Sequence, residues 1–347
     1  MSTSVKEIEK TEVKKDKKDD LLLDSLEIKG YRCFEHLTIE KLGRVNLIVG
    51  KNNVGKTALL EALWIWANNQ RSGNYIGGLS EILKNRDEIS TAEPSSHESG
   101  MLIRNIVFNR PDFERREEVK EIKIGDKNYV SIKLTSYGNF EPPNVTKEIS
   151  FKDNFFPFPA EFISPLGLKN DKLLYFWDFI ERNVQEDKVV EAINIITIDD
   201  VIDVRFSRHT FTNASAESIP IVRLKNAKER IPLRSLGDGM TRLLGIGITL
   251  VNCKDGILII DEIESGLHYS VLPDVWKLIF KTAKELNVQV FATTHSKDCI
   301  EAFAQAAVDS PEDGMLIRLE RHGEKIVAKT IEEENLALAV DYGAEMR

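Results

Sequence analysis

The segment "GKNNVGKT", residues 50–57, constrains this chain more than any other feature of its sequence. It fits the pattern G-x-x-x-x-G-K-[ST] and lies between a short apolar run, "RVNLIV", and an apolar stretch with helical spacing. Gly50 and Gly55 allow backbone N–H groups to turn around a phosphate group, and the N-terminus of the following helix adds a positive field. Lys56 would bind the β- and γ-phosphates, and the Thr57 hydroxyl would bind Mg²⁺. The segment therefore predicts a loop that binds a nucleoside triphosphate.

The composition excludes several classes of protein. The 347 residues are 42% hydrophobic and 30% charged, which is typical of a soluble protein with two domains, or with one large domain and an insertion. The formal net charge of −9 argues against a surface that coats nucleic acid, although it is compatible with a local basic patch. The three cysteines form no CxxC motif, so neither a zinc site nor a disulfide framework is predicted. No apolar run approaches the roughly 20 residues that cross a bilayer, and no signal peptide is apparent, so we expect a cytoplasmic protein without a membrane partner.

Two carboxylates follow a second apolar run, in "GILIIDE" at 256–262. A buried strand that ends there would place Asp261 at the sheet edge beside the phosphate loop, where it could hold Mg²⁺. Glu262 could then act as the general base that polarises the attacking water. A third apolar run, "VQVFATTHS", ends with His295, which could hydrogen-bond the γ-phosphate or that water. A histidine at a strand end is more often structural, but this one has the order and spacing expected after Glu262.

The stretch "SLGDGMTRLLGIGITLV" at 235–251 predicts a helix with one buried face. Its first residues include Ser235, Gly237, Asp238 and Gly239. A helix start of this kind presents free N–H groups and the positive end of the helix dipole. It could be an ordinary glycine-containing cap, or it could bind an anion.

The order of the patterns predicts an α/β fold. From Leu236 onward helices and strands alternate, which indicates a parallel sheet. Helices are expected at 56–68, 239–252, 269–286 and 297–307, with two more within 170–197. Strands are expected within 22–50, 100–138 and 201–236, and at 256–261 and 288–293. A terminal hairpin is expected to turn at His322–Gly323. The suggested divisions are a charged disordered tail (1–20), the first part of a nucleotide-binding head (21–70), an inserted β-rich and helical lobe (71–230), the second part of the head (231–310), and a C-terminal hairpin and tail (311–347).

These motifs, taken in order, resemble those of ABC-type ATPases. "GKNNVGKT", "LGDGM", "ILIIDEIESGLH" and "TTHS" look like the Walker A, signature, Walker B with D-loop, and switch-histidine motifs. The N-terminal "LEIKGYRCFEHLTIEKLGRVNLIVGKNNVGKTALLEAL" is similar to the RecF/SMC/OLD-nuclease branch. "IDEIESGLH" with "VFATTHSKDCIEAF" resembles the AAA15/AAA21-type ATPases often found in bacterial anti-phage modules. The resemblance covers approximately residues 22–70 and 230–305. It implies a parallel sheet with a P-loop and an N-terminal antiparallel β-subdomain.

The resemblance also implies a set of site residues and a homodimer, or a higher homo-oligomer, that encloses two ATP molecules. The catalytic residues would be Lys56, Glu262 and His295, with Thr57 and Asp261 as ligands of Mg²⁺. The nucleotide would contact Gly50, Lys51, Asn52, Asn53, Val54, Gly55, Lys56, Thr57 and Ala58, with Arg32 approaching from the N-terminal strands and Ser235, Gly237, Asp238 and Gly239 acting from a second copy. Residues 264–268 would form a D-loop that crosses to the partner. Two features depart from the pattern: Gly237 occupies the usual position of the signature serine, and no Q-loop glutamine can be placed within 71–230.

Three interpretations of the ATP cycle follow. In the first, the chain is the sensor or scaffold subunit of a bacterial defence or genome-maintenance complex, with a nuclease or toxin as a separate effector. OLD-type nucleases carry a Toprim domain after the ATPase, and the sequence after the last ATPase helix is too short for one. The alternative is a RecF-like DNA-binding repair ATPase, with a basic stripe along the dimer cleft. A transporter subunit would need a membrane partner, and a GTPase would need an N-K-x-D motif, which is absent.

Overall fold

The computed structural model describes residues 21–68, 82, 106, 119–135, 144–150, 158–195, 200–210, 216–310 and 313–332. The charged segment 1–20, the C-terminal residues 333–347 and nearly all of 71–118 lie outside the described residues, as do the predictions that fall on them. Within 71–118, Ile82 and Ile106 are described and both are helical, so the strand expected there is wrong at Ile106.

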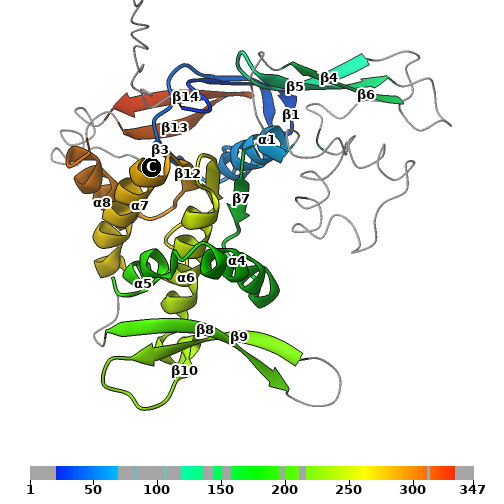
Figure 1. Ribbon diagram of the computed structural model, residues 1–347. Coiled ribbons are helices and arrows are strands. Elements are labelled where there is room, and N and C mark those ends of the chain that lie inside the picture. Colours follow the sequence, from blue (N-terminus) through cyan, green and yellow to red (C-terminus); the bar gives the residue numbers. More distant parts are fainter. Residues whose placement is uncertain are drawn as a thin grey trace, which may run out of the picture.

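A six-stranded sheet forms the centre of the molecule, with the strand order β14-β13-β3-β12-β11-β7 (Figure 1). Its strands are β3 (Val45–Val49), β7 (Ala160–Ile163), β11 (Ile257–Ile260), β12 (Gln289–Thr293), β13 (Gly314–His322) and β14 (Lys325–Glu332). Neighbouring strands are parallel, except for the antiparallel hairpin of β13 and β14. The predicted parallel sheet is therefore confirmed. Because parallel strands end at one edge, the segments that follow β3, β7, β11 and β12 meet there.

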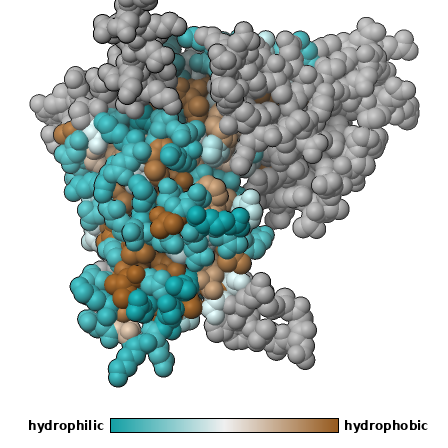
Figure 2. Space-filling model, in the orientation of Figure 1, coloured by the Kyte–Doolittle hydropathy of each residue, from teal (hydrophilic) through white to brown (hydrophobic). Residues whose placement is uncertain are grey.

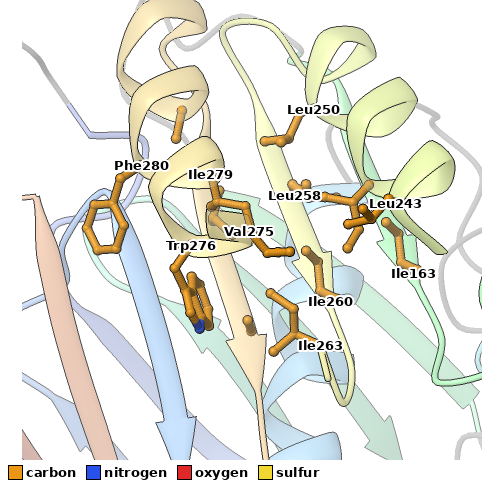
Figure 3. Close-up of a cluster of buried hydrophobic side chains, with 14 of the residues drawn as sticks. Ile163, Leu243, Leu250, Leu258, Ile260, Ile263, Val275, Trp276, Ile279 and Phe280 are labelled. Atoms are coloured by element: carbon orange, nitrogen blue, oxygen red, sulfur yellow. The ribbon is translucent and has the colours of Figure 1, made fainter. Parts of the chain in front are cut away.

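Side chains of the central strands alternate between two hydrophobic cores. Leu47 and Leu258 belong to the core beneath α6 (Asp238–Asn252), α7 (Leu272–Leu286) and α8 (Lys297–Val308), and Figure 3 shows part of this packing. Ile48 and Ile259, one position further along each strand, belong to the core beneath α1 (Lys56–Asn68). Strands covered on both faces appear as continuous apolar runs in the sequence. This explains why the runs before the phosphate loop and before the two carboxylates predicted strands.

A second, antiparallel sheet covers α1 and has the strand order β2-β1-β4-β5-β6. Its strands are β1 (Leu26–Tyr31), β2 (Phe34–Ile39), β4 (Val119–Gly125), β5 (Tyr129–Thr135) and β6 (Asn144–Ser150). The expected N-terminal antiparallel β-subdomain is thus confirmed, and strands from beyond residue 118 extend it. The turn between β1 and β2 lies at Arg32 and Cys33. Gly30 lies within β1, where a Cβ would stand 2.2 Å from the carbonyl oxygen of Glu121 on β4.

Helices α4 (Asn170–Arg182) and α5 (Glu186–Ile193) pack against α6, and confirm the two helices expected within 170–197. Gly247 of α6 allows this close approach, because a Cβ there would stand 2.8 Å from the Cβ of Ala192 on α5. A three-stranded sheet, β10-β9-β8, lies beyond these helices, formed by β8 (Val201–Thr210), β9 (Ala216–Leu224) and β10 (Ile231–Pro232). Figure 2 shows a mainly hydrophilic helical face with hydrophobic residues gathered toward this sheet.

The C-terminal hairpin is confirmed, and its turn contains Gly323 at a φ of 64°. Its first strand, β13, pairs with β3 and so belongs to the central sheet. The helix expected at 269–286 begins with a 3₁₀ turn, η2 (Tyr269–Val271), before α7. None of the helices in the described ranges is both long and apolar enough to span a membrane.

Candidate nucleotide-binding site

The loop between β3 and α1 has the backbone that its glycines predict. Gly50 and Gly55 have φ angles of 143° and 93°, and Asn53 lies in the left-handed region at 62°. A Cβ at Gly50 would stand 2.6 Å from the carbonyl oxygen of Leu319, and one at Gly55 would stand 2.6 Å from the Sγ of Cys33. Both glycines are thus required by conformation and by space. Helix α1 begins directly after them, so its free N–H groups face the loop.

The side chain of Lys56 folds back onto the start of the phosphate loop. Its Nζ donates to the carbonyl oxygens of Gly50 at 2.7 Å and Lys51 at 3.0 Å. Burial lowers the pKa of this lysine, and the nearby carboxylates of Asp261, Glu262 and Glu264 oppose that effect. A partly desolvated ammonium group at a ring of backbone donors is suited to phosphate oxygens.

Asp261, at the end of β11, connects the loop to the neighbouring strands. Its Oδ2 accepts a hydrogen bond from the Thr57 Oγ1 at 3.2 Å, and its Oδ1 accepts one from the Thr293 Oγ1 at 2.5 Å. The side chains of Thr57 and Asp261 line a cavity of about 100 Å³, together with Ser164, which directly follows β7. Hydroxyl and carboxylate oxygens are the ligands that Mg²⁺ prefers. Thr57 and Asp261 could therefore hold a magnesium ion, which would supply positive charge beside the phosphate loop.

Glu262 projects from the next position at the same sheet edge. Its φ is 47°, and its backbone N–H donates to the Thr293 Oγ1 at 2.9 Å, which fixes the turn after β11. The Ser265 Oγ donates to its Oε2 at 3.2 Å, and the His295 Nε2 lies 3.9 Å from its Oε1. The Glu262 and His295 side chains remain 42% and 44% exposed. The pair is therefore accessible to water at the rim of the site.

Arg242 of α6 was not identified from the sequence, yet it ties three elements together. Its Nη1 donates to the carbonyl oxygen of Ser164 at 2.5 Å, and its Nη2 donates to those of Asp261 at 3.0 Å and Glu262 at 2.9 Å. Burial lowers its pKa to about 10, against the opposing effect of three carboxylates led by Glu264. The guanidinium is therefore still charged at neutral pH, and it joins the signature helix to the ends of β7 and β11.

The signature segment lies away from the phosphate loop of the same chain. Ser235 lies within a 3₁₀ helix, η1 (Leu233–Leu236), Gly237 follows this helix at a φ of 118°, and Asp238 and Gly239 begin α6. The Asp238 Oδ1 accepts a hydrogen bond from the Arg234 Nε at 3.0 Å. These two residues line a wide cavity of about 1280 Å³ with the loop after β7 and with Ser265 and Gly266, and no residue of 50–57 lines it.

The other expected contacts lie around the phosphate loop. Lys51 and Asn52 are exposed at its tip, whereas Val54 and Ala58 are buried. The Arg32 Nε lies 2.8 Å from the Oε2 of Glu61, one helical turn after Thr57. Glu61 lines the cavity beside Thr57 and Asp261. Arg32 thus reaches the side of α1 next to the candidate magnesium site.

The fold and the site together define an ABC-type ATPase of the RecF/SMC branch. The sequence profile of the AAA ATPase domain family, AAA_15, matches residues 22–204 and 181–300, and the chain belongs to this family. A protein of Helicobacter pylori described as an ATP/GTP phosphatase is 26% identical over 91% of this chain and 97% of its own length. The DNA replication and repair protein RecF of Bacillus mycoides is 38% identical over 14% of this chain and 12% of its own length.

Solved structures of Smc head domains share the fold. One, bound to the C-terminal winged-helix domain of ScpA, has a TM-score of 0.54 at 13% identity, over 89% of this chain and 97% of that chain. Another has an extended coiled coil and is bound to the C-terminal domain of ScpA derived from Pyrococcus furiosus. It has a TM-score of 0.53 at 11% identity, over 93% of this chain and 99% of that chain. At these identities the similarity establishes the fold alone.

Proposed function

We propose that this chain binds ATP with Mg²⁺, hydrolyses it, and pairs with a second copy around two ATP molecules. Asp261 carries the proposal: its carboxylate contacts Thr57 of the phosphate loop and Thr293 of β12, and the candidate base Glu262 is the next residue. Phosphate binding, metal binding and water activation thus meet at one sheet edge. The name of the Helicobacter pylori relative, ATP/GTP phosphatase, supports hydrolysis of a nucleoside triphosphate.

Each residue then has a defined task. Lys56 exchanges its bonds to the Gly50 and Lys51 carbonyl oxygens for bonds to phosphate oxygens. Thr57 and Asp261 hold Mg²⁺, which supplies charge neutralisation and orientation of the phosphates. Glu262 accepts a proton from the attacking water, and His295 orients that water from the end of β12.

The separation of the signature segment from the phosphate loop supports a homodimer. Ser235, Gly237, Asp238 and Gly239 lie at the start of α6, and the cavity that Asp238 lines is not lined by any residue of 50–57. In a second copy, the free N–H groups at that helix start can complete the γ-phosphate site. The γ-phosphate would then contact both copies at once. Its loss on hydrolysis would remove that connection and weaken the dimer.

In this proposal the ATP cycle serves a bacterial defence or genome-maintenance complex, in which the chain is a sensor or scaffold for a separate effector, a nuclease or toxin. The resemblance of "IDEIESGLH" and "VFATTHSKDCIEAF" to ATPases of anti-phage modules supports this role. The Smc heads bound to ScpA domains show that a head of this fold can dock a protein partner. Neighbouring genes that encode a nuclease or toxin, together with co-purification of their product, would support the role.

The short match to RecF favours one alternative, a DNA-dependent repair ATPase. ATPase rates measured with and without duplex DNA at two salt concentrations separate the two roles. A rate that duplex DNA stimulates, and that loses this stimulation as salt rises, would favour the DNA-binding role.

Replacing Lys56 with alanine is expected to weaken ATP binding by about 10- to 100-fold, because a charge-assisted contact to the phosphates is removed. Binding of a fluorescent ATP analogue to the purified full chain measures this change. Lys277→Ala, an exposed lysine of α7, is the matched control and should bind as the parent does. Equal affinities of the Lys56→Ala variant and the parent would refute the assignment of the phosphate loop.

Removing Mg²⁺ with a chelator is expected to abolish hydrolysis, and Thr57→Val is expected to raise the Mg²⁺ concentration needed for half-maximal rate by about tenfold. The substitution keeps the shape of the side chain but removes the hydroxyl that lies 3.2 Å from the Asp261 Oδ2. Titration of phosphate release with Mg²⁺ measures the effect. An unchanged Mg²⁺ requirement in Thr57→Val would exclude this threonine as a ligand.

A further inference from the structure

The C-terminal strand β13 runs beside the phosphate loop. It pairs with β3 in parallel as far as Arg318 opposite Val49, the last residue of β3, and then continues to His322. Gly50 and Leu319, the residues after this last pair, are also close to each other. A Cβ at Gly50 would stand 2.6 Å from the Leu319 carbonyl oxygen. The last residues of β13 therefore lie next to the loop that begins at Gly50.

One side chain of this strand bonds the loop directly. The Arg321 Nη2 donates to the backbone carbonyl oxygen of Asn53 at 2.8 Å. Asn53 is the non-glycine residue of the loop with a left-handed φ, 62°. Its carbonyl group and the N–H of Val54 belong to one planar trans peptide and point in opposite directions. By fixing the carbonyl oxygen, Arg321 also fixes the Val54 N–H, which is directed away from β13.

The charge of Arg321 is not taken up by an acidic side chain within the described ranges. Glu320 contacts three other basic side chains of the hairpin, with the Lys329 Nζ at 2.8 Å, the Arg318 Nε at 3.1 Å and the His322 Nε2 at 3.3 Å. Side chains alternate along a strand, so Glu320 projects from the face opposite to that of Arg321. Leu319, which shares the face of Arg321, is buried in the same core as α1. The guanidinium thus stands on the face of the sheet that carries the phosphate loop.

The surroundings of Cys33 support this placement. Burial raises the pKa of the Cys33 thiol, and the positive charges of Arg321 and Arg32 oppose that rise. The Cys33 Sγ in turn stands 2.6 Å from the position of a Cβ on Gly55. Arg321 therefore lies near both the middle of the loop, at Asn53, and its last glycine.

We propose that Arg321 is a positioning residue for the triphosphate: it holds the Asn53–Val54 peptide in the orientation that binds phosphate and supplies positive charge beside it. This inference rests on the proposed nucleotide function of residues 50–57. It assigns to the C-terminal hairpin a direct part in nucleotide affinity. Arginine suits this task because its permanent positive charge strengthens the hydrogen bond to the Asn53 carbonyl oxygen.

The experiment compares Arg321→Met, which keeps the aliphatic stem, with Arg321→Lys, which keeps the charge. We expect Arg321→Met to raise the KM for ATP and the Kd of a fluorescent ATP analogue by about five- to tenfold, with kcat within about twofold of the parent. Arg321→Lys should recover part of the affinity. Added salt should weaken the parent more than Arg321→Met, because the charge contribution is screened. Lys329→Ala, on the opposite face of the hairpin, is the matched control and should leave KM unchanged.

The outcomes are distinguishable. If the parent binds ATP and Arg321→Met binds it equally well, the inference is wrong while the proposed function stands. If Arg321→Met lowers kcat at unchanged KM, Arg321 acts in the chemical step and the positioning role is overturned. A loss that Arg321→Lys does not relieve, together with a lowered Tm, would assign Arg321 a structural role only. If the parent itself binds no nucleotide, the proposed function and this inference both fail.

Discussion

Glu262→Gln is expected to bind ATP as tightly as the parent and to hydrolyse it about two to three orders of magnitude more slowly. Glutamine has nearly the same shape but cannot accept the proton of the attacking water, and general-base catalysis typically contributes about 10²- to 10⁴-fold. The hydrogen bond from the Glu262 N–H to Thr293 uses the backbone and is therefore retained. Steady-state phosphate release gives the rate, and an equilibrium titration with a fluorescent analogue gives the affinity.

The same variant tests the dimer, because slow hydrolysis should let the ATP-bound state accumulate. Light scattering after size-exclusion chromatography should show a dimer with ATP and Mg²⁺, and a smaller species without nucleotide. Glu285→Gln, at the exposed end of α7, is the matched control and should hydrolyse at the parent rate. Hydrolysis at the parent rate by Glu262→Gln would show that another group is the base. A Glu262→Gln protein that binds ATP but remains monomeric would contradict the two-copy site.

The parts of the site that the sequence predicts are those set by local rules. The pattern of the loop requires glycine at positions 50 and 55, and both residues have positive φ angles. Asp261 and Glu262 can be predicted as site residues because a short apolar run before two carboxylates indicates a buried strand that ends at a polar edge. β11 ends at Ile260, directly before them. Short-range signals such as these need no knowledge of which strands are neighbours.

Two residues of the site, Ser164 and Arg321, cannot be predicted from the sequence because their positions depend on the pairing of strands that are far apart in the chain. Ser164 reaches the cavity beside Thr57 because β7 pairs with β11, and nothing in its own four-residue strand indicates that neighbour. Arg321 lies in a hairpin that was expected, but its place beside the phosphate loop follows from the pairing of β13 with β3. Arg242 was overlooked for another reason. A charged residue beside the apolar positions of a helix ordinarily points to solvent, and here it is buried against carbonyl oxygens.

Replacing Arg242 with methionine is expected to lower the free energy of unfolding by about 2–4 kcal/mol, because buried carbonyl groups lose their donor. The carbonyl oxygens affected belong to Ser164, Asp261 and Glu262, so the turn that carries the candidate base loses its support from α6. We therefore expect kcat to fall by at least about tenfold while the KM for ATP changes little, since the phosphate loop is untouched. Urea denaturation measures the first effect, and phosphate release well below the Tm measures the second.

Arg234→Met is the matched control for Arg242→Met. Arg234 stands two turns earlier on the same segment, is 82% exposed and pairs with Asp238 at the surface, so its loss should change stability by less than about 0.5 kcal/mol. Arg242→Lys should be intermediate, because an ammonium group keeps the charge but is shorter and cannot span the carbonyl oxygens of β7 and β11 together. If Arg242→Met were as stable and as active as the parent, the three hydrogen bonds would be incidental. If it lost stability but kept its kcat, Arg242 would support the fold without positioning Glu262.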